Sequence, residues 1–309
     1  MARWSAADIP DLTGRTAVVT GANSGLGWQT ALELARHGAT VTMACRDGEK
    51  GADALNRLRA EAPDADATVR ILDLADLTSV QSFADDLTRS QPKIDVLVNN
   101  AGVMAVPYRE TVDGFEAQFA TNHLGHFALT GRLLPALLAE PNSRVVTVSS
   151  TAAAFGRLDF DDLQSKHRYL RWPAYSQSKL ANQLFAYELA RRAEAAGTTL
   201  ISVAAHPGYA ATNLQTAAPV SEGNRVRAEL MRITNLVFAQ SDVDGALPQL
   251  YAATAPDVAT GEYLGPDSWF GQRGHPTRVT PPRQARSTEA AQRLWAVSEE
   301  LTGVVYEFA

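Results

Sequence analysis

Tyr175 and Lys179 stand four residues apart in the segment Tyr175-Ser176-Gln177-Ser178-Lys179. If this segment is helical, the spacing places the phenol and the ammonium on one face. A nearby ammonium favours the phenolate, so we expect the pKa of Tyr175 to fall and its side chain to donate or accept a proton near neutral pH. Tyr187 and Arg191 repeat the spacing about three turns further along, so a solvated helix face is the alternative.

A glycine-rich turn, Thr20-Gly21-Ala22-Asn23-Ser24-Gly25-Leu26-Gly27, lies between an apolar run at 16–19 and a helix-like run at 28–35. Its three glycines leave room for a pyrophosphate to approach the backbone and the amino end of the helix. The spacing is G-x-x-x-G-x-G, whereas the common dinucleotide fingerprint is G-x-G-x-x-G. A plain strand-to-helix turn is therefore the alternative to a dinucleotide site.

Short apolar strands alternate with helical segments along most of the chain. We expect strands at 16–19, 39–44, 68–72, 94–98, 144–148, 200–204 and 262–264. We expect helices at 28–35, 49–60, 80–87, 115–138 with a kink at Pro135, 174–195, before Pro256 and after Ser287. This order predicts an α/β fold, a single Rossmann-type doubly wound parallel sheet of about seven strands with helices on both faces.

We expect one domain over residues 1–309, with an N-terminal extension at 1–13, a substrate lid at 215–240 and a C-terminal loop and helix at 266–309. Hydrophobic residues make up 45% and charged residues 20%, which is typical of a soluble globular protein. The net charge of −6 argues against nucleic acid or an anionic membrane as the main partner.

A single cysteine, Cys45, excludes an intramolecular disulfide and a multi-cysteine zinc site. His123 and His126 have no carboxylate or cysteine at metal spacing, so we expect packing or interface roles for them, a structural role for His206, and no metal site. An apolar leader and an apolar run of ~18 residues are absent from the sequence, so we expect a cytoplasmic protein without a membrane anchor.

From about Gly14 to Thr212 the chain resembles the classical short-chain dehydrogenase/reductase family. Six motifs occur in the family's order: Thr20 to Gly27, Asn99-Asn100-Ala101-Gly102, Asn122, Ser150, Tyr175 to Lys179, and Pro207-Gly208 with Thr212. The resemblance implies catalytic roles for four of these residues. Tyr175 would exchange a proton with the reacting oxygen, Ser150 would hydrogen-bond that oxygen, Lys179 would lower the pKa of Tyr175 and hold the nicotinamide ribose, and Asn122 would hold a water connecting Lys179 to solvent.

The resemblance also implies a binding site for a nicotinamide dinucleotide. Its residues would be Gly21, Asn23, Ser24, Gly25, Leu26, Gly27, Arg46, Asp73, Leu74, Asn100, Ala101, Gly102, Tyr175, Lys179, Pro207, Gly208 and Thr212. Family members that prefer NAD usually carry an acidic residue at the end of the second strand. This chain has Cys45 and then Arg46, whose guanidinium can pair with a 2′-phosphate, so we expect NADP(H). NAD(H) is the alternative, because Asp47 lies beside Arg46 and because Arg46 could be solvated or stacked on the adenine instead.

Ser150 and Tyr175 are twenty-five residues apart, a longer spacing than is common in the family. It resembles the retinol dehydrogenase and protochlorophyllide reductase-like branch and implies a bulky, apolar carbonyl or alcohol. We expect Phe155, Tyr209 and Leu214 to contact it. The family also implies a homodimer or homotetramer formed through the two long helices. Two other functions stay open: a non-catalytic NADP(H)-binding regulator and an NAD-dependent alcohol dehydrogenase.

Overall fold

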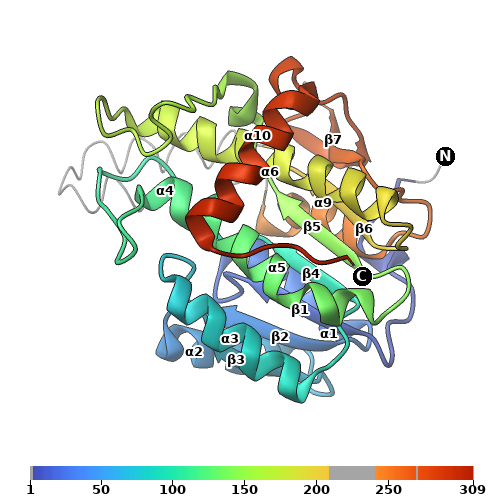
Figure 1. Ribbon diagram of the computed structural model, residues 1–309. Coiled ribbons are helices and arrows are strands. Elements are labelled where there is room, and N and C mark those ends of the chain that lie inside the picture. Colours follow the sequence, from blue (N-terminus) through green and yellow to red (C-terminus); the bar gives the residue numbers. More distant parts are fainter. Residues whose placement is uncertain (1–2, 209–240, 269–270, 309) are drawn as a thin grey trace, which may run out of the picture.

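The computed structural model describes residues 3–208, 241–268 and 271–308, which form an eight-stranded sheet. The strand order is β3-β2-β1-β4-β5-β6-β7-β8 (Figure 1). The parallel strands are β1 Thr16–Thr20, β2 Thr40–Cys45, β3 Ala67–Ile71, β4 Val96–Asn99, β5 Arg144–Val148, β6 Ile201–Ala205 and β7 Tyr263–Ser268. The predicted doubly wound α/β sheet is confirmed.

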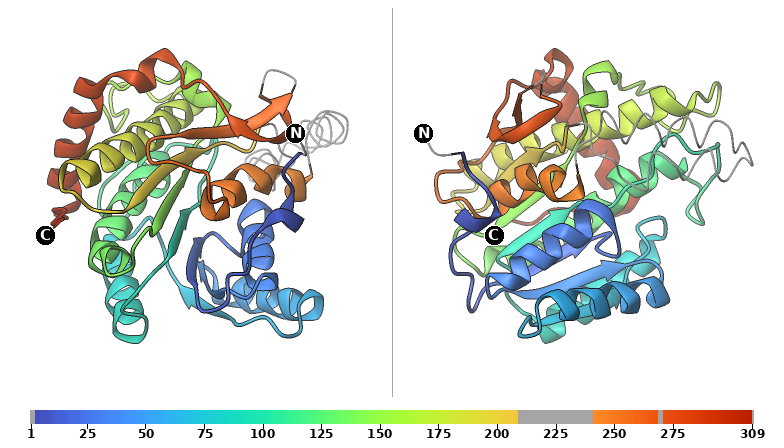
Figure 2. Two further views of the ribbon diagram at one scale, coloured as in Figure 1. Left: turned by 90° about the vertical axis from the view of Figure 1, so that its right-hand side faces the viewer. Right: turned by 180° about the vertical axis from the view of Figure 1, so that it is seen from behind.

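Helices cover both faces of the sheet (Figure 2). One face packs against α1 Gly25–Arg36, α2 Gly48–Glu61 and α9 Asp242–Thr254. The other packs against α3 Leu77–Ser90, α5 Gly125–Leu138 and α6 Arg171–Ala195. Within β1, Ala17 and Val19 enter the first core, and Val18 enters the second. Both faces are buried, which explains why the strands are almost continuously apolar.

The long helix expected at 115–138 is divided in the structure. It begins as α4, Ala117–Phe119, where the Glu116 carboxylate accepts the amides of Gln118 and Phe119. A π-helical turn follows at Ala120–Leu124, and α5 then continues to Leu138 with Pro135 inside it. The irregularity therefore surrounds Asn122, as π-turns often do at functional sites. A sequence pattern of apolar residues does not distinguish a π-turn from an α-turn.

The expectation of a loop from residue 266 is wrong. β7 extends to Ser268, and β8, Arg273–Arg278, pairs with it antiparallel, with Pro266 opposite Pro276. Proline lacks an amide donor and is tolerated in edge strands, so a proline pattern that predicts a loop is compatible with this last strand. The closing helix is α10, Thr288–Thr302, after a 3₁₀ turn at Arg283–Arg286.

Both terminal segments pack on the body of the protein. Within the N-terminal extension, Ala6–Asp8 form a 3₁₀ turn and the Trp4 ring meets the edge of Tyr251 on α9. At the other end, α10 crosses α6, and the segment after it runs along α5 (Figure 1). Trp295 of α10 and Tyr306 of the last segment are buried in the same core as α5. The C-terminus thus covers part of the two long helices.

Candidate active site

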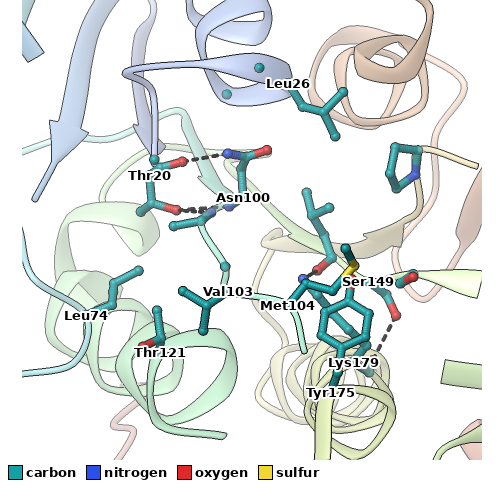
Figure 3. A pocket seen from close by; sticks show the side chains of 18 of the residues that line it. Thr20, Leu26, Leu74, Asn100, Val103, Met104, Thr121, Ser149, Tyr175 and Lys179 are labelled. Carbon is teal, nitrogen blue, oxygen red and sulfur yellow. Dashed lines mark hydrogen bonds between the residues drawn. The ribbon is translucent and has the colours of Figure 1, made fainter. Parts of the chain in front are cut away.

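A cavity of about 650 Å³ opens at the carboxyl ends of the parallel strands (Figure 3). Ligands bind at this edge of open α/β sheets. It gathers the predicted residues Gly21, Asn23, Ser24, Gly25, Leu26, Gly27, Arg46, Asp73, Leu74, Asn100, Ala101, Gly102, Ser150, Phe155, Tyr175, Lys179, Pro207 and Gly208. Asn122 lies buried behind the wall. Tyr209, Thr212, Leu214 and the predicted lid at 215–240 lie outside the described residues.

The glycine turn has the geometry that a bound pyrophosphate requires. Gly21 and Gly25 have φ of +66° and +57°, in the left-handed region that favours glycine. A Cβ at Gly27 would lie 2.5 Å from the carbonyl oxygen of Gly21. Ser24, the N-cap of α1, makes no side-chain capping hydrogen bond, so the first amides of α1 are not satisfied from that side chain. The turn therefore fits an anion at the positive end of a helix.

Thr20 and Asn100 join the glycine turn to the loop that follows β4. The Asn100 amide nitrogen Nδ2 donates to the carbonyl of Thr20 at 2.8 Å (Figure 3). The Thr20 hydroxyl oxygen accepts the main-chain amides of Asn100 and Ala101, each at 2.9 Å. Two strand ends at the centre of the sheet are thereby held together where the cavity crosses them.

Ser150, Tyr175 and Lys179 line the other end of the cavity. Tyr175 and Lys179 are 6% and 4% exposed, and the Lys179 ammonium donates to the carbonyl of Val148 at 3.0 Å. Ser150 follows β5 and interacts with the phenol of Tyr175. Its neighbour Ser149 donates instead to the carbonyl of Lys179 at 2.8 Å. The three side chains place a proton donor, a hydroxyl and a cation beside one another.

The expected fall in the pKa of Tyr175 is not what the structure indicates. Burial of the phenol raises its pKa, because the phenolate loses hydration, and the interaction with Ser150 opposes this only in part. Burial also lowers the pKa of Lys179 to about 8. The lysine is hydrogen-bonded to the Val148 carbonyl, so a spacing of four residues did not by itself make its ammonium the dominant influence on the phenol.

Asn122 supports the cavity wall from behind. Its Oδ1 accepts the Val103 amide at 2.8 Å, and its Nδ2 donates to the Val103 carbonyl and the Ser178 hydroxyl, both at 2.9 Å. A Cβ at Gly102 would lie 3.0 Å from Asn122 Oδ1 and 3.4 Å from Lys179 Nζ. Glycine at 102 therefore lets the loop pass close to both side chains.

Arg46 is exposed at the end of β2 and lines the cavity. Asp47 is engaged elsewhere, because its carboxylate caps α2 through the Lys50 amide and lies 3.2 Å from the Lys50 ammonium. A second cation that the sequence did not single out is Arg57 on α2. It donates to the Asn23 carbonyl at 2.9 Å, and its position depends on how α2 packs beside the turn.

Aromatic side chains lie at the catalytic end of the cavity. Phe155, a predicted substrate contact, is 85% exposed, and Trp172 is 49% exposed. The Trp172 ring meets the Tyr175 ring edge-on with centroids 6.1 Å apart. Sequence reasoning missed Trp172 because it started the helix at 174, whereas α6 begins at Arg171. An aromatic residue three positions before Tyr175 would have indicated it.

The histidines in the described part of the chain take hydrogen-bonding roles. His123 lies 2.9 Å from the Ser298 hydroxyl, and His206 accepts the Gly208 amide at 3.2 Å beside the cavity. The structure has no group of three or more His, Cys, Asp or Glu side chains in residues 3–208, 241–268 and 271–308 that could hold a metal ion. Over the same ranges, every helix is too short or too polar to cross a membrane.

Comparison with known proteins finds relatives over most of the chain. The family model for short chain dehydrogenases matches residues 15–222. Mouse retinol dehydrogenase 14 is 40% identical, over 94% of this chain and 87% of that protein. Human retinol dehydrogenase 13 is 41% identical, over 97% of this chain and 87% of that protein.

Solved structures agree with these sequence relatives. An uncharacterized protein from Mycobacterium paratuberculosis is 48% identical, with a TM-score of 0.82 over 99% of this chain and 100% of that chain. A short chain dehydrogenase from Shigella flexneri, complexed with NADP, is 25% identical, with a TM-score of 0.64 over 82% of this chain and 97% of that chain.

Proposed function

Because the chain belongs to the short chain dehydrogenase family and is an oxidoreductase of its retinol dehydrogenase-like branch, we propose that it interconverts a carbonyl and an alcohol on a bulky, apolar substrate with NADP(H). The observation that carries this proposal is one continuous cavity. It has the glycine turn and the amino end of α1 at one end, and Ser150, Tyr175 and Lys179 at the other.

Bound NADP(H) supplies or accepts the hydride. Tyr175 donates a proton to the carbonyl oxygen during reduction and takes it from the hydroxyl during oxidation. Ser150 hydrogen-bonds the same oxygen as charge develops on it. Lys179 would hold the hydroxyls of the nicotinamide ribose. Asn122 holds the wall behind Lys179 and a water that returns protons from solvent. The proton transfer thus depends on residues of three separate elements.

Cofactor binding follows from the other end of the cavity. The turn at 21–27 and the amides at the start of α1 would hold the pyrophosphate. Asp73 and Leu74 would contact the adenine, while Pro207, Gly208 and Thr212 would contact the nicotinamide end. Arg46 pairs with the 2′-phosphate, and the engagement of Asp47 with Lys50 supports NADP(H) over NAD(H). The NADP in the Shigella flexneri relative supports the same choice.

The substrate class is proposed from the exposed aromatic side chains near Tyr175. Phe155 and Trp172 offer apolar surface at the catalytic end of the cavity, which a bulky apolar carbonyl or alcohol would cover. Tyr209, Leu214 and residues 215–240 are proposed as the remaining substrate contacts and lid. The printed names of the curated relatives, retinol dehydrogenases, support an apolar substrate.

Substitution of Tyr175 separates the enzyme from a non-catalytic NADP(H)-binding regulator. The assay is a panel of apolar ketones, aldehydes and secondary alcohols, with NADPH absorbance as the readout, and cofactor affinity is measured by NADPH fluorescence. In Tyr175→Phe we expect kcat to fall about 100-fold or more, with the NADPH Kd within about threefold of wild type. Tyr187→Phe, on the same helix and also four residues before a cation, is the matched control. Full activity in Tyr175→Phe would refute the mechanism.

A further inference from the structure

His126 is buried one turn after Asn122 and is bonded through both ring nitrogens. Its Nδ1 lies 2.9 Å from the main-chain carbonyl oxygen of Asn122, and its Nε2 lies 2.9 Å from the hydroxyl oxygen of Thr20. These partners belong to the π-helical turn and to the end of β1, which lie far apart in the sequence. The imidazole therefore bridges two elements that border the active-site cavity.

The hydrogen-bond partners fix the tautomer of this imidazole. A carbonyl oxygen can only accept, so Nδ1 carries the hydrogen. Burial lowers the pKa of His126 to about 4, and the nearby Lys179 charge acts in the same direction, so the ring is neutral and Nε2 accepts. The Thr20 hydroxyl then donates to Nε2 at 2.9 Å, which is closer than its other acceptor, the Val98 carbonyl at 3.3 Å.

With its hydrogen directed to His126, the Thr20 oxygen is free to accept, and it accepts the amides of Asn100 and Ala101. At the other end of the same loop, Asn122 holds both the amide and the carbonyl of Val103. His126 is bonded to both of these anchors. The loop at 100–103 is thus held at its two ends by residues that a single imidazole connects.

We propose that His126 is a positioning residue that locks the loop at 100–103 between Thr20 and Asn122 and so pre-shapes the wall of the cofactor cavity. Its consequence for catalysis rests on the proposed function. The bond to Thr20 acts on cofactor affinity through Asn100 and Ala101. The bond to Asn122 acts on turnover through Ser178, which Asn122 holds next to Lys179. His123, one turn earlier and equally buried, bonds Ser298 on α10 and has neither connection.

The test compares substitutions that remove one or both bonds. In His126→Phe both are lost, and we expect the NADPH Kd to rise about tenfold and kcat to fall, because the loop at 100–103 is no longer held at either end. His126→Asn can keep the donor to the Asn122 carbonyl and lose the contact with Thr20. His126→Asn should therefore raise the NADPH Kd by about as much as Thr20→Val does, and kcat should be nearly unchanged. His123→Phe, the matched control, should lower the melting temperature without this division between Kd and kcat.

A readout without substrate or cofactor is amide hydrogen exchange in the apo protein. We expect the peptide that spans 98–104 to exchange about tenfold faster in His126→Phe and Thr20→Val but not in His123→Phe. Equal exchange in His126→Phe and wild type, or equal acceleration in His123→Phe, overturns the positioning role. If His126→Phe does not fold, His126→Asn and Thr20→Val decide the same question. Failure of wild-type protein to bind NADPH or NADH would refute the proposed function, while the exchange measurement still tests His126.

Discussion

The phenol of Tyr306 donates a hydrogen bond of 2.6 Å to the main-chain carbonyl of Phe127, so the last residues of the chain are fixed to the middle of α5. Gly131 makes this possible, because a Cβ there would lie 2.6 Å from Val304 and 2.7 Å from the Tyr306 ring. Trp295 of α10 adds to the same aromatic cluster with Phe127. The apolar face of α5 is thus covered by the chain's own C-terminus.

Removal of residues 304–309 should therefore destabilise the protein and expose an apolar surface. Loss of the buried Val304 and Tyr306 side chains is expected to cost about 3 kcal/mol or more, lowering the melting temperature by several degrees. Sedimentation velocity should show concentration-dependent self-association of the truncated chain through α5 and α6. Wild-type protein, whose tail covers this face, should not associate through it. Identical sedimentation of both forms would show that the tail does not prevent pairing there.

Ser149 and Ser150 are expected to differ in what their substitution changes. Ser150→Ala removes the hydroxyl that interacts with Tyr175 and that accepts the Ala152 amide at 3.2 Å, so kcat should fall about 10-fold to 100-fold, with a loss of at most about 1 kcal/mol in stability. Ser149→Ala removes a buried hydrogen bond to the Lys179 carbonyl, so its main effect should be a loss of about 1 kcal/mol in stability. Steady-state kinetics and thermal unfolding of both variants check this. The reverse pattern would assign the catalytic hydroxyl to Ser149.

The stability of the protein should decrease as the pH falls below the ordinary pKa of histidine. Burial lowers the pKa of His126 and His206 from 6.5 to about 4, and that of His123 to about 3. Between these values the unfolded chain binds protons that the folded chain does not, so the free energy of unfolding falls as the pH drops from 6.5 toward 4. Each histidine contributes on the order of 3 kcal/mol over this window.

Thermal unfolding measured from about pH 4 to about pH 7.5, a range that includes the titration of histidine, tests this effect. Carboxylates also titrate at the acidic end of this pH range. The contribution of one histidine is therefore isolated by comparing wild type with His123→Gln. The variant lacks one titrating group. The slope of its unfolding free energy against pH should therefore correspond to the uptake of about one proton fewer than in wild type. An unchanged slope would mean that His123 is not held neutral in the folded state.

The sequence predicted those features that depend on local pattern. Apolar runs located the strands β1 to β7, and the glycine spacing at 21–27 located the turn that lines the cavity. Features that depend on tertiary packing were not predictable. The apolar residues around Asn122 suit an α-helix and a π-turn equally, and Pro276 of β8 is compatible with an edge strand only because β7 lies beside it. The pKa of Tyr175 depends on burial, which a spacing of four residues does not reveal.

Arg46 should determine the choice between NADPH and NADH. It is exposed at the cavity, and within the described part of the chain it has no ion-pair partner, so its guanidinium is available for a phosphate. Because a hydrogen bond to a charged group contributes about 1.5–3 kcal/mol, Arg46→Ala should weaken NADPH binding about 10-fold to 100-fold and leave NADH binding within about twofold.

The matched control for Arg46 is Lys50→Ala, which removes a cation that pairs with Asp47. The main-chain amide of residue 50 still holds the Asp47 carboxylate in this variant, so the ratio of the two dissociation constants should change by less than about twofold. Fluorescence titration with each cofactor measures that ratio. Arg57→Ala tests the second cation near the turn, which is bonded to the Asn23 carbonyl. A preference for NADPH that survives in Arg46→Ala but is lost in Arg57→Ala would transfer recognition of the 2′-phosphate from β2 to α2.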